Sequence, residues 1–268
     1  MEKAMQVFDF FEFYYQTKQD KNMKKFNLLL MSIGVIVSTL CMQSCLSDDD
    51  NNNNIAFPTA LVTVKPNFDN TSFYMQLNDS TTLNPTNMKV SPFGKKEVRA
   101  LVNYTIASQE PAHNNHAISI NWIDSILTKQ PAANLGSMNE TTYGNDPVSI
   151  VNDWVTIAED GYLTLRFRTK WSSGIKHIVN LVATGDENNP YKVTFYHNAN
   201  KDLNGFVGDG LVAFRLSDLP DTEGKYVDLT LEWNSYSGVK TAKFKYCTRK
   251  STNTESGIAL GTFTKDIK

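Results

Sequence analysis

The sequence predicts an all-β fold, in which a small closed β-barrel is followed by an antiparallel β-sandwich. From Phe57 onward apolar residues recur at every second position, which is the period of a strand with one buried face. No long stretch repeats with the helical period of about 3.6 residues, and clusters of Asn, Asp, Gly and Pro separate the alternating segments. A polar stretch from 130 to 147 divides these segments into two groups.

The first group, within 57–140, is predicted to form the barrel. Four segments place apolar residues on one face: Ala60–Val64; Phe73, Met75 and Leu77; Val98, Ala100, Val102, Tyr104 and Ile106; and Ile118, Ile120 and Trp122. Turn-forming residues lie between them, including Asn78-Asp79-Ser80 and Asn84-Pro85. Roughly five short strands over about 75 residues are typical of a small barrel.

The second group, within 141–268, alternates more regularly and predicts the sandwich. In its clearest segment, apolar and polar residues take opposite faces: Leu163, Leu165, Phe167 and Trp171 against Thr164, Arg166, Arg168 and Lys170. Further strands are expected at 177–183, 191–197, 211–216, 227–233 and 240–246. About seven strands with one apolar face indicate an antiparallel sandwich.

Residues 23–44 have the features of a lipoprotein signal peptide. Met23-Lys24-Lys25 supplies the positive charge, and the apolar run 26–40 is shorter than the ~20 residues of a membrane span. The sequence Met42-Gln43-Ser44-Cys45 resembles a lipobox, which predicts lipidation of Cys45 and attachment to a membrane through two acyl chains. The alternative is a plain signal peptide with an incidental cysteine.

The segments on either side of the signal peptide follow from this assignment. Residues 1–22 place acids and aromatics ahead of the positive charge, so we expect translation to begin at Met23 and 1–22 to be a misassigned extension. Residues 45–56 are rich in Asp and Asn and are expected to form a disordered tether. Within it, Ser47, Asp48, Asp49 and Asp50 resemble the acidic export signal of surface lipoproteins, although a spacer would have the same composition.

Charge and cysteine content exclude some classes of function. The net charge is −2, which gives no reason to expect nucleic acid or an anionic membrane surface as the main partner. After Cys45 the only cysteine is Cys247, so the mature chain has no internal disulfide framework. By alternation Cys247 falls on the polar face of its strand, where it is either partly exposed or displaced by a bulge.

Beyond these patterns, the chain resembles the NigD-like lipoproteins. The resemblance rests on the lipobox with its Asp-rich tail, on the barrel block, and on four strand-like segments of the second block: Gly161–Arg168, His177–Val182, Tyr191–Asn198 and Gly210–Ser217. It implies an OB-type barrel followed by a β-sandwich, no established enzyme activity, and a role in bacteriocin immunity or peptide secretion.

Two histidines are candidates for a site. His177 and His197 both fall on the inward face of their strands, and neighbouring strands would bring their imidazoles together near one end of the sandwich. One interpretation is a metal or acid–base site, and the other is a pair of hydrogen-bonded structural histidines. Spacing fixes no third or fourth ligand, so the structural interpretation is favoured and no metal or cofactor is expected.

Other constellations carry weaker signals. His113 and His116 lie in an Asn-rich stretch and not on a helix, and Asp202, Asn204 and Asp209 lack the acidic twelfth ligand of an EF-hand loop. No nucleophile elbow, phosphate loop, zincin motif or dinucleotide fingerprint occurs in the sequence. The acidic pairs Asp186-Glu187 and Glu159-Asp160 lie at expected turns, where acids are ordinary.

Aromatic and basic residues suggest binding surfaces. Tyr162, Tyr196 and Tyr236 are expected to point outward and are the candidate ligand contacts, whereas three tryptophans are assigned to the core: Trp154, Trp171 and Trp233. A basic patch would form if its strands share a sheet, and a solvated face is the alternative: Arg166, Arg168, Lys170, Lys243 and Lys245.

The sequence therefore predicts a lipid-anchored, non-catalytic protein of the outer membrane, exposed on the cell surface in preference to the periplasmic face. We expect it to be an interaction or accessory factor, with immunity or secretion as the specific role. The alternative is a surface module that binds a glycan or a peptide. Its expected partners are the membrane, through Cys45, and a protein, peptide or glycan, but not nucleic acid.

Overall fold

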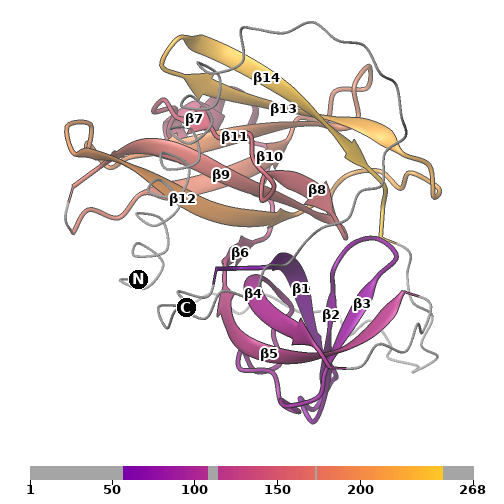
Figure 1. Cartoon of the computed structure of the whole chain (residues 1–268). Helices are drawn as coiled ribbons and strands as arrows, with labels where there is room; N and C mark the ends of the chain where they lie inside the picture. The colour runs from indigo at the N-terminus through magenta and orange to yellow at the C-terminus, as the bar shows by residue number, and fades with distance from the viewer. Residues whose placement is uncertain (1–56, 108–113, 173, 250–268) are drawn as a thin grey trace, which may run out of the picture.

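The computed structural model describes residues 57–107, 114–172 and 174–249, which form two β domains (Figure 1). The predicted signal peptide, the lipidation site at Cys45 and the acidic tether lie outside the described residues. Among the described residues, no helix has both the length and the apolar character that crossing a membrane requires.

Five strands form the first domain and close into the predicted barrel in the order β1-β2-β3-β5-β4. They are β1 (Ala60–Pro66), β2 (Phe73–Gln76), β3 (Thr82–Pro85), β4 (Val98–Ile106) and β5 (Asn115–Ser125). All neighbours are antiparallel except β3 and β5, which are parallel. The barrel core is built from the inward face that alternation predicts, with Val62, Met75 and Val102 fully buried.

Two details of the barrel differ from the prediction. Asn84 and Pro85, predicted to form a turn, belong to β3, which is too short to display a period of its own. In β5 the register shifts opposite Asn103 and Tyr104, so Asn121 is an extra residue. Such a bulge reverses the faces of the residues that follow it. As a result Trp122 leaves the barrel face on which it was predicted, and Ile123 packs against the barrel core in its place.

The second domain consists of two facing sheets, in the orders β10-β11-β13-β14 and β6-β12-β9-β7, with β8 paired to β9. Its strands are β6 (Leu127–Lys129), β7 (Ser149–Ile150), β8 (Ile157–Glu159), β9 (Tyr162–Trp171), β10 (Ile178–Ala183), β11 (Lys192–Asn198), β12 (Phe206–Arg215), β13 (Val227–Ser235) and β14 (Gly238–Tyr246). Two short helices, η1 (Gly136–Met138) and α2 (Asn139–Tyr143), precede β7. The predicted sandwich is confirmed.

The sandwich differs from a fully antiparallel one in two pairings. β11 and β13 are parallel, as are β6 and β12. Because β6 belongs to the second domain, the sandwich begins near Leu127 and not at the predicted boundary of 140/141. Strands of two or three residues, such as β6, β7 and β8, cannot display a period and were not predicted.

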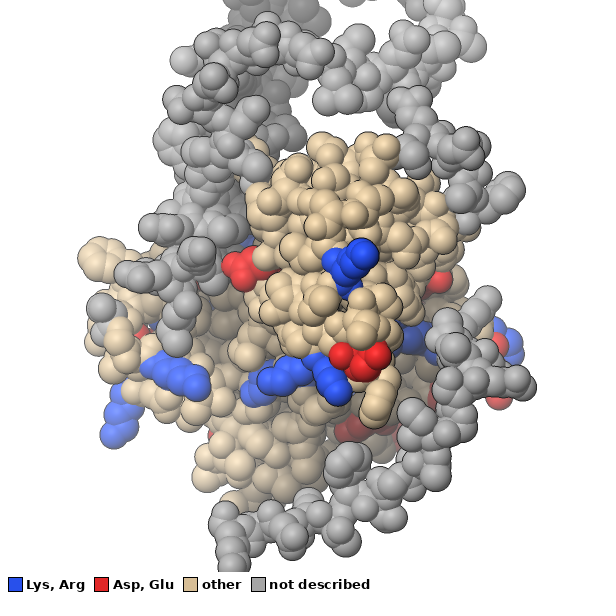
Figure 2. Space-filling model, turned by 90° about the horizontal axis from the view of Figure 1, so that it is seen from below, with Lys and Arg blue, Asp and Glu red and all other residues tan. Residues whose placement is uncertain are grey.

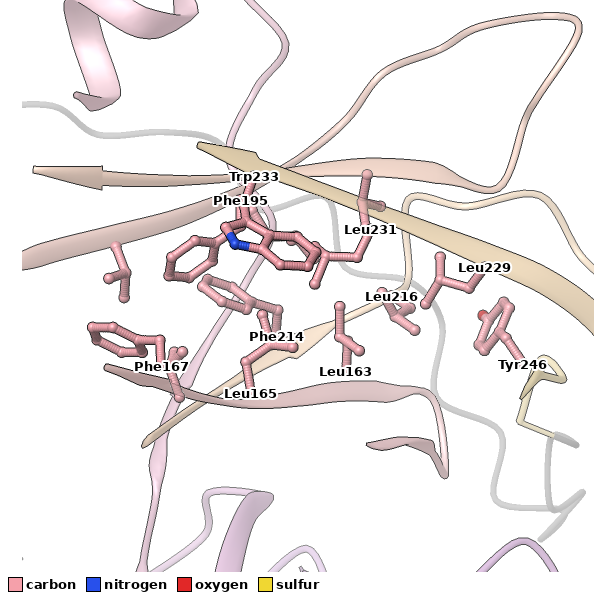
Figure 3. Packing of buried hydrophobic residues seen from close by; sticks show 14 of the residues in the cluster. Leu163, Leu165, Phe167, Phe195, Phe214, Leu216, Leu229, Leu231, Trp233 and Tyr246 are labelled. Carbon is pink, nitrogen blue, oxygen red and sulfur yellow. The ribbon is translucent and has the colours of Figure 1, made fainter. Parts of the chain in front are cut away.

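The main core lies between the two sheets of the sandwich (Figure 3). Leu163, Leu165 and Phe214 of the lower sheet face Phe195 and Trp233 of the upper sheet. The Phe195 and Phe214 rings meet edge to face, with centroids 6.1 Å apart and planes at 76°, an arrangement that aromatic pairs favour. This continuous apolar layer holds the ends of the strands in fixed positions.

The barrel packs against the β8–β9 side of the sandwich through a second apolar cluster. Leu61, Leu101 and Ile126 of the barrel side contact Val155, Tyr162 and Ala213 of the sandwich. Tyr162 was predicted to point outward as a ligand contact, and this prediction is wrong, because Tyr162 is fully buried in this cluster. Its hydroxyl donates a hydrogen bond of 2.6 Å to Glu97 Oε1.

Charged residues surround this interface. Glu97 Oε1 accepts from Arg249 at 2.9 Å and from Arg215 at 3.3 Å, and Lys65 pairs with Asp160 at 2.9 Å. The guanidinium groups of Arg215 and Arg249 also lie 5.0 and 5.4 Å from the centroid of the Tyr162 ring. The two domains are therefore joined by both apolar packing and ion pairs.

Candidate functional site

The candidate site is the end of the sandwich that lies away from the barrel, on the left in Figure 1, and we call it the distal end. It consists of the end of β9, the starts of β10 and β12, the end of β11 and the β13–β14 turn. The strand register brings these together, since Trp171 pairs with Phe206, Ile178 with Asn198 and Ser235 with Gly238.

A row of hydrogen-bonded side chains forms the base of the distal end. His177 Nδ1 lies 2.9 Å from His197 Nε2, and His177 Nε2 lies 3.2 Å from Asp202 Oδ2. At the other end of the row, His197 Nδ1 lies 3.2 Å from the carbonyl oxygen of Asp146. The Ser172 amide donates to Asp202 Oδ2 at 2.6 Å. Both histidines and Asp202 are buried at their side chains.

The hydrogen-bond partners of His197 and Asp202 indicate where the protons of the row lie. A carbonyl oxygen only accepts, so His197 Nδ1 carries a hydrogen. Burial, together with the neighbouring His177, lowers the pKa of His197 to about 4, so His197 is neutral and its Nε2 accepts from His177 Nδ1. Hydrogen bonds from Ser172 and His177 lower the pKa of Asp202, which is therefore a carboxylate. His177 Nε2 faces this carboxylate at 3.2 Å, so His177 lies between Asp202 and His197 in the row.

This arrangement bears on the two interpretations of the histidines. They lie together at one end of the sandwich, as predicted, but all four ring nitrogens have partners. Among residues 57–107, 114–172 and 174–249, no group of three or more His, Cys, Asp or Glu side chains could hold a metal ion. The hydrogen bonds agree with the structural interpretation, which the sequence favours.

Neighbouring residues hold the row in place. The Trp171 ring stacks on His177, with centroids 4.1 Å apart, and its Nε1 donates to the Gly208 carbonyl at 2.8 Å. A Cβ at Gly208 would lie 2.8 Å from the Trp171 ring, so only glycine leaves room for the indole. Asp146 also accepts a hydrogen bond from the Ala199 amide at 2.8 Å. The loops that follow β9 and β11 are therefore tied to the sandwich.

Above this base, the distal end exposes apolar side chains and lysines. Phe206 is 89% exposed and Val207 69%, and the β13–β14 region adds Tyr236 at 56% and Val239 at 70%. Other partly exposed apolar residues of the same end are Ile175, Ile178 and Leu203. Four lysines are also exposed there: Lys170, Lys176, Lys201 and Lys240.

The three candidate tyrosines have different environments. Tyr236 points outward as predicted, and its hydroxyl lies 3.1 Å from Thr169 Oγ1. Tyr196 is half-buried beside α2, where its ring centroid lies 6.0 Å from that of Tyr143. Tyr162 lies in the domain interface. Of the three candidate tyrosines, Tyr236 is the one whose side chain is exposed enough to contact a ligand.

The tryptophans also differ. Trp233 lies in the core as predicted and Trp171 packs against it, half-buried. Trp154 is 46% exposed, which contradicts its assignment to the core. It lies between β7 and β8, strands too short for the sequence to reveal.

The basic patch required a shared sheet and does not form, because β9 and β14 belong to different sheets. Arg166 and Arg168 are ion-paired with Asp209, and Arg166 also pairs with Asp153 at 2.8 Å. Lys243 and Lys245 both lie beside Asp228 on the outer face of β14. Asp209 pairs with Arg166 and Arg168, and Asp202 bonds to His177, so neither carboxylate is free to bind calcium in the manner of an EF-hand loop.

His116, Cys247 and Asp160 have environments that the sequence predicted only in part. His116 lies in β5 and not in a loop, while His113 lies outside the described residues. Cys247 follows β14 and is partly exposed, as one of its two predicted alternatives requires, with Sγ 3.6 Å from Thr222 Oγ1. Asp160 is buried and paired with Lys65, so it is more than an ordinary turn residue.

On the face that Figure 2 shows, charged side chains of both signs are scattered and form no continuous basic groove. Single-stranded nucleic acid requires such a groove, lined with aromatic side chains. That nucleic acid is not a partner stays a prediction.

Sequence reasoning missed the apolar and lysine-rich surface of the distal end, and it missed Glu97, Arg215 and Arg249 at the domain interface. Phe206 and Val207 precede the segment in which β12 was predicted, so their exposure had no visible signal. The interface residues come from distant parts of the chain, and only the packing of the domains brings them together.

Comparison with known proteins identifies the family. The NigD-like N-terminal OB domain matches residues 61–126, and the NigD-like C-terminal beta sandwich domain matches residues 130–246. No curated protein matches the chain.

Solved structures agree with this assignment. A protein of Parabacteroides distasonis described as toxin-related is 40% identical over 70% of this chain and 92% of its own, with a TM-score of 0.61. A NigD-like immunity protein from Bacteroides caccae is 21% identical over 70% of this chain and 96% of its own, with a TM-score of 0.52. A protein of unknown function from Bacteroides vulgatus is 21% identical over 75% and 95%, with a TM-score of 0.57. The resemblance seen in the sequence is confirmed, and the chain belongs to the NigD-like family.

Proposed function

We propose that this chain is a lipid-anchored envelope protein that protects its cell by binding a protein toxin, without catalysis. The observation that carries the proposal is the state of the histidine row. It contains the residue types of a catalytic site, yet each ring nitrogen of His177 and His197 already has a protein partner. A general acid or base must reach a substrate proton directly or through one water, and these buried groups face only each other and the protein.

The relatives support the same class of function. One similar structure is called a NigD-like immunity protein and another is described as toxin-related. An immunity protein acts by occupying a toxin, so it requires a stable surface and no reactive group. The sandwich supplies such a surface at its distal end, where tied loops expose apolar side chains.

The proposed location follows from the N-terminal sequence. Lipidation at Cys45 would hold the two domains at a membrane, and the segment Ser47–Asp50, with its three aspartates, favours export to the cell surface. A protein at this position would meet a toxin before the toxin reaches its target. Protease treatment of intact cells is expected to remove the domains while a periplasmic control protein survives.

A glycan-binding function is the second candidate, and it rests on Tyr236. The exposed ring of Tyr236 could stack on a sugar face, but Tyr162 and Tyr196 do not extend this platform. One exposed aromatic side chain is weaker support for glycan binding than the larger apolar surface is for protein binding.

The test is protection of a sensitive strain. The full chain is expressed in cells that a toxin-producing neighbour kills, with Cys45→Ser as the matched control that removes the acyl anchor. We expect the wild-type chain to restore growth beside the producer and the Cys45→Ser chain to protect at least tenfold less. Equal killing of cells with and without the wild-type chain, across a panel of producers, would refute the proposal.

A further inference from the structure

Several exposed apolar side chains belong to the strand ends and turns of the distal end. Phe206 and Val207 come from β12, and Tyr236 and Val239 from the β13–β14 region, while Leu203 lies in the loop before β12. Single exposed apolar residues are normal on a protein surface, but a contiguous apolar group marks an interaction site. Here the strand register places these segments at one end of the sandwich.

The charges of the distal end have one sign. Lys170, Lys176, Lys201 and Lys240 are exposed, and none of them forms an ion pair within the described part of the chain. The carboxylates nearby are engaged internally: Asp202 with His177, Asp209 with arginines and Asp146 with the Ala199 amide. The described surface of this end therefore presents positive charge without exposed carboxylates to balance it.

The base beneath this surface is preorganised. The loop after β9 is held by the bond from the Ser172 amide to Asp202, and the loop after β11 by the bond from the Ala199 amide to Asp146. Asn200 Nδ2 also donates to the carbonyl of Lys176, which joins the two loops. A surface that is already ordered loses little conformational entropy when a partner binds.

From these observations we propose that the distal end is the docking surface for an acidic, apolar segment of a protein partner. Phe206 and Tyr236 supply the apolar contacts, and the four lysines pair with carboxylates of the partner. Charge complementarity selects the partner and speeds encounter, whereas the desolvated aromatic contacts supply most of the affinity. This inference rests on the proposed function, that the chain acts by binding a protein.

The probe is a random peptide library displayed on phage and selected on the immobilised, full-length mature chain. Enriched peptides are synthesised and their Kd values measured by fluorescence anisotropy. We expect peptides that combine Asp or Glu with aromatic or aliphatic residues. Their affinity should fall at least fivefold between 50 and 300 mM salt, since screening at these ionic strengths weakens exposed ion pairs.

Paired variants locate the site. Phe206→Ser and the double variant Lys170→Glu/Lys201→Glu are each expected to raise Kd at least tenfold. Phe68→Ser and Lys89→Glu are the matched controls, because both residues are exposed on the barrel and lie away from the distal end. Their Kd values should stay within twofold of wild type, and all four proteins should keep the wild-type circular dichroism spectrum.

Several results would overturn the inference. The inference fails if the library yields no binding peptide, or if the enriched peptides lack acidic residues. It also fails if the peptides bind the Phe206→Ser variant as tightly as the wild-type chain. Two other outcomes would reassign the surface. Binding to phosphatidylglycerol vesicles that Phe206→Ser abolishes would indicate a lipid, and dimerisation lost in the same variant would indicate a second copy. Protection of sensitive cells by a Phe206→Ser chain would reject this surface while leaving the proposed function intact.

Discussion

At the residue scale, the histidines show how far sequence alone can go. The alternation of the sequence predicts that His177 and His197 lie on inward faces. In the structure His177 Nδ1 lies 2.9 Å from His197 Nε2. Their role could not be derived from spacing, because Asp146 and Asp202 come from loops whose course no periodicity describes. These two loop residues occupy the outer ring nitrogens of the pair, which agrees with a structural role for the imidazoles.

The first prediction concerns the titration of His197. Its pKa is lowered from 6.5 to about 4 in the folded chain. Between these values the unfolded state binds the proton and the folded state does not, so the free energy of unfolding decreases as pH falls from 6.5 to 4. The full decrease from this group is about 3 kcal/mol. NMR of the imidazole carbons should give a midpoint near 4, and a midpoint near 6.5 would contradict the hydrogen-bond assignment.

At the scale of elements, long strands were predictable and short ones were not. β9 and β13 alternate over nine or ten residues and were located within two residues of their ends. The segment after α2 has no such pattern, yet its Asp146 bonds to His197 and Ala199 at the distal end. Gly144 allows it to do so, because its φ of 84° and ψ of 163° are accessible essentially to glycine alone.

The second prediction tests this close approach. A Cβ at Gly144 would lie 2.6 Å from the His197 carbonyl oxygen and 2.7 Å from Asn198 Cα, both backbone atoms. Gly136→Ala is the matched control, because Gly136 also has a positive φ, of 60°, but has open space around it. We expect Gly136→Ala to lower the free energy of unfolding by about 1 kcal/mol and Gly144→Ala by about 3 kcal/mol. Equal losses in urea denaturation would show that the segment does not pack as described.

At the scale of the whole molecule, the contact between the domains explains the errors about β9. Its polar face was predicted to be solvated, but Tyr162, Thr164 and Arg166 are all buried. Part of this face lies against the barrel, and Tyr162 is at the centre of the contact. A sequence shows which residues share a face of a strand, but it does not show that another domain covers the polar face.

The third prediction concerns Glu97. Burial opposes its ionisation, but the hydrogen bond from Tyr162 and the charges of Arg249 and Arg215 outweigh this effect and lower its pKa. Glu97→Gln should therefore weaken three contacts at once and reduce the free energy of unfolding by about 2 kcal/mol. Glu232→Gln, which removes one partly exposed pair with Lys192, is the control and should cost less than about 0.5 kcal/mol. Equal effects of the two changes in urea denaturation would mean that the interface ion pairs do not stabilise the fold.

The central claim is that the chain acts by binding and not by catalysis, and stoichiometry tests it most directly. The full chain is expressed at graded levels in sensitive cells, and the toxin dose that each culture survives is measured. Binding predicts that the tolerated dose rises in proportion to the number of chains per cell, because each chain occupies one toxin molecule. Protection that saturates at a low level of chain, with toxin activity disappearing over time, would show turnover and contradict the account.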